Sequence, residues 1–337
     1  MDMTKDALRH DVVGIGNAIV DVIARADDDF LLKHDLRKGG MTLIDEARAH
    51  ALYAAMGQTT VVSGGSAANT IIGLAGLGAR AAFVGKLRAD ELGAMFAHDI
   101  RAAGVAFTTA PAADGAASAR CLIVVTPDGQ RTMSTFLGAC QNLTPGDVDE
   151  ESVAGAAVTY LEGYLWDPPA AKDAFRKAAA ISRAAGRQTA LSLSDAFCVD
   201  RYRGEFLELI RSGAVQILFA NESELHSLYE TADFSTALAA LAGENILGVV
   251  TRSEKGCVVV GGGSVVEAPA FPVETVVDTT GAGDLFAAGF LAGHVRGRPA
   301  AECAKLGALA AAEIIQHIGA RPQADLRQLA QQNWIAI

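Results

Sequence analysis

Short hydrophobic runs alternate with longer amphipathic stretches over much of the chain. The runs at 12–16, 59–62 and 81–84 predict buried strands, and the stretches at 67–77 and 91–103 predict helices between them. A strand–helix–strand series is typical of a parallel sheet with helical crossovers. We therefore expect these segments to build one sheet covered by helices.

The same alternation returns in the second half of the chain. We expect strands near 159–162, 189–193, 217–220 and 248–251, helices at 169–184, 201–211, 222–230 and 235–242, and two final apolar helices at 284–295 and 300–317. Neither a linker nor an internal repeat interrupts this order. The pattern predicts a single α/β domain over residues 1–337.

One region breaks the rhythm. Residues 118–136 form two extended pieces around Pro127-Asp128-Gly129, which indicates a hairpin. The alternating segment at 17–24 and the extended piece at 39–44 have the pattern to pair with it. We expect these three segments to form a small β lid on the domain.

Composition narrows the class of protein. Half of the 337 residues are hydrophobic and the net charge is −11, which argues against general nucleic-acid binding but permits a nucleotide ligand in a local pocket. The five cysteines are scattered without metal-ligand spacing, as in a reducing compartment. The charged first residues lack the apolar core of a signal peptide, and we find no apolar run long enough for a membrane span. We expect a cytoplasmic protein.

The most specific chemistry lies in the stretch DTTGAGDLFAAGF at 278–290. Gly281, Ala282 and Gly283 precede an apolar helix, and the N–H groups at such a helix start can bind an anion. Asp284 would repel a phosphate there unless it accepts the proton of an attacking hydroxyl. The alternative is an acid that merely favours the helix dipole.

Two strand ends carry further candidates. Asn221 and Glu224 start a helix, where they can hold a hydrated Mg²⁺ or form a capping box. Thr251, Arg252 and Gly256 follow another strand, and their donors suit phosphate oxygens, although a plain polar loop explains them equally well. Because ligands bind at the carboxyl ends of parallel strands, both stretches are candidates for a phosphate-binding site.

A third group lies near the N-terminus. Asp21 interrupts an apolar strand, where its carboxylate either faces solvent or accepts hydrogen bonds from a vicinal diol, and Asn17 lies beside it. Gly65, Ser66 and Asn69 add donors and a close backbone approach, or they serve as a helix cap and packing positions. The dinucleotide, P-loop, zinc-protease and nucleophile-elbow motifs do not occur.

These motifs, in this order and spacing, resemble the ribokinase-like (PfkB) family of carbohydrate and nucleoside kinases over nearly the whole chain. DTTGAGDLFAAGF resembles the C-terminal family signature, SGGSAANTIIGLAGLGARAAFVGKL the N-terminal one, and Asn221 with Glu224 the family's NxxE element. The resemblance implies a three-layer α/β/α domain with a central, mostly parallel sheet and a small β-sheet lid. It also implies ATP as phosphoryl donor and Mg²⁺ as cofactor.

The resemblance implies a role for each candidate. Asp284 would be the catalytic base, and the amides of Gly281, Ala282 and Gly283 the anion hole for the γ-phosphate. Thr251, Arg252, Gly256 and Asn221 would bind ATP, and Glu224 would organise Mg²⁺ through water. The substrate hydroxyls would be held by Asn17, Asp21, Gly65, Ser66 and Asn69.

Within the family the chain is similar to adenosine kinases, on GNAIVDV, GGSAANT, Arg131-Thr132-Met133 and AAAEIIQHIGARP. Adenosine 5′-phosphorylation is the expected reaction, with a sugar kinase for ribose, fructose or 2-keto-3-deoxygluconate as the alternative, and a non-catalytic nucleoside- or sugar-binding module as a third reading. The candidates for a wall against the base are Tyr164, Trp166, Phe136 and Met41. We expect a monomer, or a homodimer formed through the lid.

The chain also departs from the family pattern. Arg88 and Ala89 are unusual in the loop after Val84, and Ser253 stands where many members carry glycine. These departures bear on the details of phosphate binding and leave the expected reaction unchanged.

Overall fold

Nine strands of the described residues form the large sheet of this computed structural model, which describes residues 8–335 and 337. The charged stretch at residues 1–7 lies outside the described part. The strands are, in spatial order, β14 (Ser264–Ala268), β13 (Cys257–Gly261), β12 (Leu247–Thr251), β11 (Ile217–Asn221), β10 (Gln188–Ser192), β9 (Ala156–Glu162), β1 (His10–Ile15), β5 (Ala81–Val84) and β6 (Ala106–Phe107). Neighbours from β6 to β12 pair in parallel, and β13 and β14 are antiparallel.

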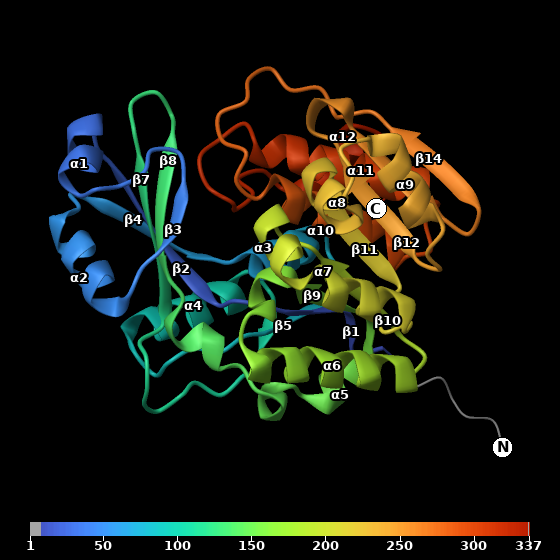
Figure 1. Cartoon of the computed structure of the whole chain (residues 1–337), viewed down its shortest axis with the longest axis horizontal. Helices are drawn as coiled ribbons and strands as arrows, with labels where there is room; N and C mark the ends of the chain where they lie inside the picture. The colour runs from blue at the N-terminus through green and yellow to red at the C-terminus, as the bar shows by residue number, and fades with distance from the viewer. Residues whose placement is uncertain (1–7, 336) are drawn as a thin grey trace.

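Helices cover both faces of this sheet, because its strands are apolar on both sides (Figure 1). One face packs against α3 (Ser66–Gly76), α10 (Ala282–His294) and α11 (Ala300–Ile314), with α12 (Leu326–Gln332) beyond them. The opposite face packs against α5 (Glu150–Ala154), α6 (Pro169–Ala184), α7 (Ala196–Arg211), α8 (Glu222–Tyr229) and α9 (Phe234–Ala242). The three-layer α/β/α architecture is confirmed.

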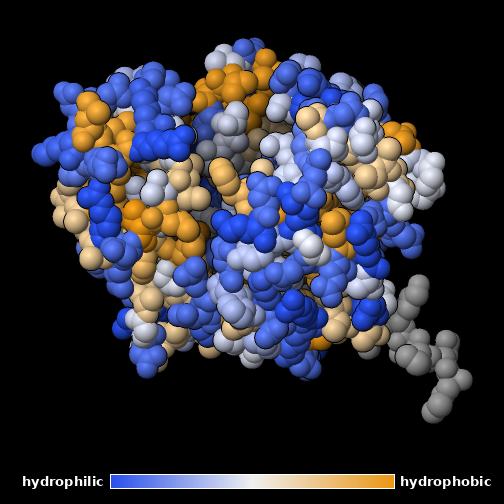
Figure 2. Space-filling model, in the orientation of Figure 1, coloured by the Kyte–Doolittle hydropathy of each residue, from blue (hydrophilic) through white to orange (hydrophobic). Residues whose placement is uncertain are grey.

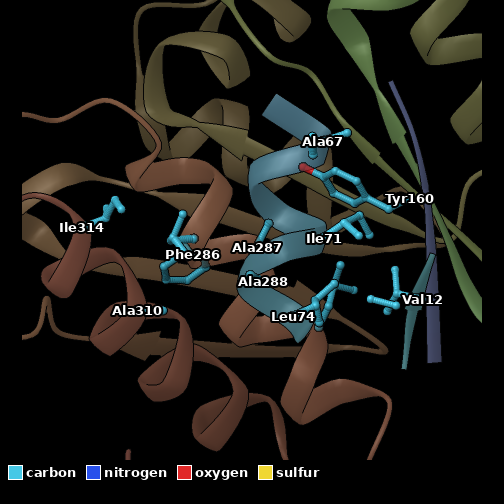
Figure 3. Close-up of a cluster of buried hydrophobic side chains, with 14 of the residues drawn as sticks. Val12, Ala67, Ile71, Leu74, Tyr160, Phe286, Ala287, Ala288, Ala310 and Ile314 are labelled. Atoms are coloured by element: carbon cyan, nitrogen blue, oxygen red, sulfur yellow. The ribbon is translucent and has the colours of Figure 1, made fainter. Parts of the chain in front are cut away.

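The helix α3 lies at the centre of the first face. Figure 3 shows it between the strands that carry Val12 and Tyr160 and the helix α10 that carries Ala287 and Ala288. Gly73 permits this close approach, since a Cβ there would lie 2.8 Å from the Cβ of Ala288. The starts of α3 and α10 therefore sit on one rigid scaffold.

A second sheet of the described residues has the order β3 (Met41–Leu43), β8 (Arg131–Phe136), β7 (Ala119–Val125), β2 (Ile19–Arg25) and β4 (Thr59–Gly64). On β2, Val20, Val22 and Ala24 are buried on the face that packs against α2 (Glu46–Ala55) and α4 (Glu91–Ala102), with α1 (Asp28–Lys33) nearby. The alternate residues, Asp21 among them, point to the other face.

The structure corrects the placement of residues 59–62. The sequence pattern placed them in the parallel sheet, whereas β4 pairs antiparallel with β2 in the small sheet, with Asp21 opposite Val62. A short apolar run predicts a strand but carries no information about its partner. As a result β4 delivers Ser63 and Gly64 directly to the side of Asp21.

Local boundaries differ for physical reasons as well. The helix α1 ends at Lys33, because Asp35 adopts a left-handed φ of 49°. The helix expected at 201–211 begins at Ala196, because Asp195 caps it by accepting a hydrogen bond from the N–H of Cys198. The elements α5, α12 and β6 were not anticipated.

Candidate active site

No side chain among the described residues caps the start of α10. Gly281 precedes it with a φ of 80°, and a Cβ there would lie 2.8 Å from the Cβ of Ala320. The N–H of Ala282 donates to the carbonyl of Thr279 at 3.2 Å, while the N–H groups of Gly281 and Gly283 have no acceptor among the described residues. Two of the three amides expected in an anion hole are therefore free, and Ala282 is the least available.

The carboxylate of Asp284 is held by residues distant in sequence. The hydroxyl of Ser66 donates to its Oδ1 at 2.6 Å, and the amide of Asn69 donates to its Oδ2 at 2.9 Å. Burial raises the pKa of Asp284 to about 6, although both hydrogen bonds and the charge of Arg321 act to lower it. The Oδ1 of Asn69 is buried without a partner in the described residues, so it remains open to a ligand.

A buried acid holds Asn17 in place. Glu162, 1% exposed at the end of β9, accepts hydrogen bonds from the Nδ2 and the backbone N of Asn17 at 2.6 and 3.3 Å and from the N of Ala67 at 2.8 Å. Gly16 leaves room for this carboxylate, because a Cβ there would lie 2.3 Å from the Oε2 of Glu162. Burial raises the pKa of Glu162 to about 7. Sequence reasoning missed this residue, although an acid at the end of an apolar strand was a visible signal.

The carboxylate of Asp21 lies over Gly64, close to the segment that carries Asn17. A Cβ on Gly64 would lie 2.5 Å from the Oδ2 of Asp21, and Gly65, with a φ of 98°, backs onto the carbonyl of Asn17. Burial raises the pKa of Asp21 to about 6. The segments that were expected to hold substrate hydroxyls are thus adjacent.

A second residue missed from the sequence is Arg321, in the loop after α11. Its Nε donates to the carbonyl of Ser63 at 2.8 Å, and its NH1 donates to the carbonyl of Ala68 at 3.3 Å. Its charge lowers the pKa values of both Asp21 and Asp284, while burial lowers its own pKa to about 10. Arg321 therefore offsets the two acids and ties β4 to the start of α3.

The small sheet also contacts the loop before α10. Arg131 of β8 forms an ion pair with Asp278, and both side chains are buried. Asp278 also accepts from the N–H groups of Thr280 and Gly319 at 3.0 and 2.9 Å. In Figure 2 the surface is hollowed between the small sheet and the larger body. The strand β8 thus contacts the loop that precedes α10 directly.

At the start of α8, Asn221 and Glu224 form a capping box. The Oδ1 of Asn221 accepts from the N of Glu224 at 2.8 Å, and the carboxylate of Glu224 accepts from the N and the Nδ2 of Asn221 at 3.0 and 2.7 Å. Glu224 is buried, which raises its pKa to about 7, and the charges of Asp195 and Asp284 add to this shift. The prediction of a capping box is confirmed, and the carboxylate of Glu224 lies near those of Asp195 and Asp284.

The loop after β12 lies beside that box, because Thr251 pairs with Asn221 across the sheet. Arg252 contacts Glu222 at 3.3 Å and lies 3.7 Å from the ring centroid of Phe234, so its guanidinium is already engaged within the chain. Ser253 adopts a left-handed φ of 51°, which accounts for the glycine that many family members carry at this position.

The candidate aromatic wall divides into two groups. Trp166 is fully buried against Phe175 and Phe206, and Phe136 lies on the face of the small sheet opposite to Asp21, so neither faces the site and these two candidates are wrong. Met41 and Tyr164 are exposed. Leu43 shares the face of Asp21 across β8 and β7, and Phe197 at the start of α7 is 76% exposed.

The residues that the structure describes offer neither a ready-made cluster of metal ligands nor a membrane-spanning helix. No group of three His, Cys, Asp or Glu side chains is placed to hold a metal ion. No helix within residues 8–335 combines the length and apolar character needed to cross a membrane.

Comparison with known proteins places this geometry in context. Residues 40–326 match the model of the pfkB family carbohydrate kinases. The adenosine kinase of Sinorhizobium meliloti superposes with a TM-score of 0.91 at 56% identity, over 96% of this chain and 99% of that one. A probable sugar kinase of Rhizobium etli CFN 42 superposes with a TM-score of 0.92 at 51% identity, over 98% and 100%. Adenosine kinase of Saccharomyces cerevisiae is 27% identical over 91% of this chain and 95% of its own length.

Proposed function

The chain belongs to the pfkB family of carbohydrate kinases and is therefore a kinase, and we propose that its acceptor is adenosine. In this proposal the 5′-hydroxyl of adenosine is phosphorylated to give AMP. The observation that carries the phosphoryl transfer is the placement of Asp284, and the likeness to the adenosine kinase of Sinorhizobium meliloti favours adenosine as the acceptor. Its carboxylate is fixed by Ser66 and Asn69 beside an uncapped helix start. That arrangement suits a proton acceptor placed next to an anion site.

In the proposed reaction the oxygen of the acceptor hydroxyl forms a bond to the γ-phosphorus of ATP, and the bond between that phosphorus and the departing oxygen of ADP breaks. Asp284 takes the proton of the acceptor hydroxyl. The free N–H groups of Gly281 and Gly283 hydrogen-bond the oxygens of the transferred phosphoryl group. A pKa of about 6 leaves Asp284 ionised at neutral pH and still basic enough to accept a proton.

The acceptor side suits a ribose with an attached base. Asp21 supplies a carboxylate for the two ribose hydroxyls, and Asn17 supplies an amide whose orientation Glu162 sets. The exposed apolar side chains of Leu43 and Phe197 are available for the face of a base.

ATP is assigned to the strand ends at Asn221 and Thr251, with Gly256 beside them. Burial raises the pKa of Glu224, and the charges of Asp195 and Asp284 add to this shift, so a hydrated Mg²⁺ near Glu224 would relieve the repulsion between these carboxylates. Glu224 would hold such an ion through water, and the ion would neutralise charge on the phosphates. Arg252, engaged by Glu222 and Phe234, is assigned to positioning the loop.

The small sheet is proposed to close over the acceptor. Arg131 of β8 joins it to Asp278, and Arg321 joins Ser63 of β4 to the loop after α11. These contacts link the acceptor-binding strands to the phosphate-binding loop, as a lid that excludes water requires.

A sugar kinase is the second candidate, favoured by the likeness to the probable sugar kinase of Rhizobium etli CFN 42. The test measures ADP formation from ATP with adenosine, inosine, ribose, fructose and 2-keto-3-deoxygluconate in turn. We expect adenosine to give the highest kcat/KM and a product with phosphate on the 5′-oxygen. A higher kcat/KM with any of the free sugars would overturn the adenosine assignment and keep the kinase class.

A further inference from the structure

The carboxylate of Glu162 joins two parts of the site that are far apart in sequence. It accepts from the amide and backbone of Asn17, between β1 and β2, and from the N–H of Ala67, in the first turn of α3. That same turn carries Ser66, whose hydroxyl holds Asp284. One buried acid therefore touches both the acceptor side and the support of the base.

The contacts of Glu162 restrict how Asn17 can lie. The Nδ2 of Asn17 donates to Oε1 at 2.6 Å, so its Oδ1 is directed away from the acid. Gly16 is required for this approach, because any side chain at that position would begin within the carboxylate. The amide of Asn17 is thus presented in one orientation, with its oxygen available as an acceptor for a ligand hydroxyl.

We propose that Glu162 is a positioning residue for the transfer reaction, which fixes the acceptor-binding amide of Asn17 and the first turn of α3 relative to each other. This inference rests on the proposed acceptor side of the site. It requires only that Asn17 contacts the acceptor, whether that is a nucleoside or a sugar.

Protonation of Glu162 would weaken this arrangement, because a carboxylic acid carries a donor where three donors already converge. The titratable groups that face it in the described chain are Asp284 of α10, Tyr160 of its own strand, Tyr164, and Cys140 of the 3-10 turn Gly138–Asn142. Burial raises the pKa values of Tyr160 and Cys140. Asp284 and Glu162 are then the members of this group that titrate between pH 5 and 8.

The test substitutes Glu162→Gln. The glutamine amide has one acceptor oxygen and places an NH₂ donor against a donor of Asn17 or Ala67. We expect the KM for adenosine to rise about 10- to 100-fold while kcat falls less and the KM for ATP stays within about 3-fold. The acid limb of kcat/KM for adenosine should lose its ionisation near pH 7 and shift toward pH 6, the pKa that remains for Asp21 and Asp284.

Asp11 provides a matched control, because it lies at the end of β1 that is remote from Asn17. Asp11 also accepts a backbone N–H and guanidinium hydrogen bonds, from Arg80 at 2.8 and 2.7 Å, and it lies at the amino end of that strand. Asp11→Asn should leave the KM for adenosine and the pH profile unchanged. An unchanged adenosine KM and an unchanged acid limb in Glu162→Gln would overturn the proposal, whatever happens to its stability.

Calorimetry of adenosine binding without ATP separates this inference from the proposed function. No binding to the wild type would mean that the assigned acceptor is wrong, and the same comparison is then made with the active sugar of the panel. Wild-type affinity in Glu162→Gln would mean that the positioning role is wrong. If Glu162→Gln does not fold, Glu162→Asp serves, because it keeps the charge and shortens the reach; it should raise the acceptor KM, and an unchanged KM would contradict the proposal.

Discussion

The helices α8 and α10 begin alike and end up with opposite chemistry at their starts. Each carries an acid at its third position, Glu224 in α8 and Asp284 in α10. The carboxylate of Glu224 bonds to Asn221, three residues away, and closes a capping box. The carboxylate of Asp284 bonds instead to Ser66 and Asn69, 218 and 215 residues away.

The difference teaches how a helix start becomes a site. In α8 the side chain of Asn221 accepts from the N–H of Glu224 and the carboxylate of Glu224 accepts from the N–H of Asn221, so the acid stabilises its own helix. In α10 glycine replaces the capping side chain, which leaves N–H groups open to an anion, and the acid is held by another helix. An acid at the third position of a helix is therefore a cap when the start of its own helix donates to its oxygens, and a candidate base when another helix does.

The largest expected effect comes from Asp284→Asn. We expect kcat to fall at least about 100-fold, because the amide cannot accept the proton of the attacking hydroxyl, while the Kd for adenosine stays within several-fold. Steady-state ADP formation and calorimetry measure the two quantities. Near-normal turnover would remove the distinction between the two helices.

A smaller effect is expected from Ser66→Ala, which removes one donor to Asp284. We expect kcat to fall about 10-fold, with the acid limb of kcat displaced to higher pH, since this hydrogen bond favours the charged carboxylate. Thr70→Ala is the matched control, because its hydroxyl contacts the carbonyl of Ser66 in the same helix instead of Asp284. Equal pH profiles in wild type and Ser66→Ala would show that Ser66 does not tune the base.

The smallest expected effect is one on stability, at the start of α8. Asn221→Ala removes the capping box and should lower the free energy of unfolding by about 1 kcal/mol, as loss of a cap does. Urea unfolding measures this loss, with Asp284→Asn as the comparison, whose helix has no side-chain cap to lose. Unchanged stability in Asn221→Ala would mean that the capping box does not stabilise α8. The contrast between a capping acid in α8 and a candidate base in α10 would then be wrong for α8.

Much of this contrast was visible in the sequence, and the reasons for the remainder are physical. The family resemblance covered DTTGAGD and NxxE, and hydrophobic periodicity located most of the helices and strands of the large sheet. Periodicity could not assign residues 59–62 to the small sheet, because strand pairing depends on distant partners. Local sequence patterns predict local contacts, which is why the capping box of Asn221 and Glu224 was one of the two interpretations of that pair.

Long-range contacts were beyond the reach of local patterns. Glu162 and Arg321 act through residues that lie 145 and 258 positions away, such as Asn17 and Ser63. Trp166 looked available for a base because its size suits stacking, yet it fills the core between α6 and α7. Side chains that connect separate elements can be recognised only once the fold has brought those elements together.

The central claim is that Asp284 accepts the proton of the acceptor hydroxyl. The most direct test is the pH dependence of the single-turnover rate of phosphoryl transfer at saturating adenosine and ATP, in the wild type and in Asp284→Asn. Saturation suppresses the contributions that Asp21 and Glu162 make through binding of the acceptor. The carboxylate is the active form and burial raises its pKa to about 6, so the wild-type rate should fall as pH drops through about 6. The residual rate of Asp284→Asn should lack that ionisation, and the same acid limb in both proteins would contradict the account.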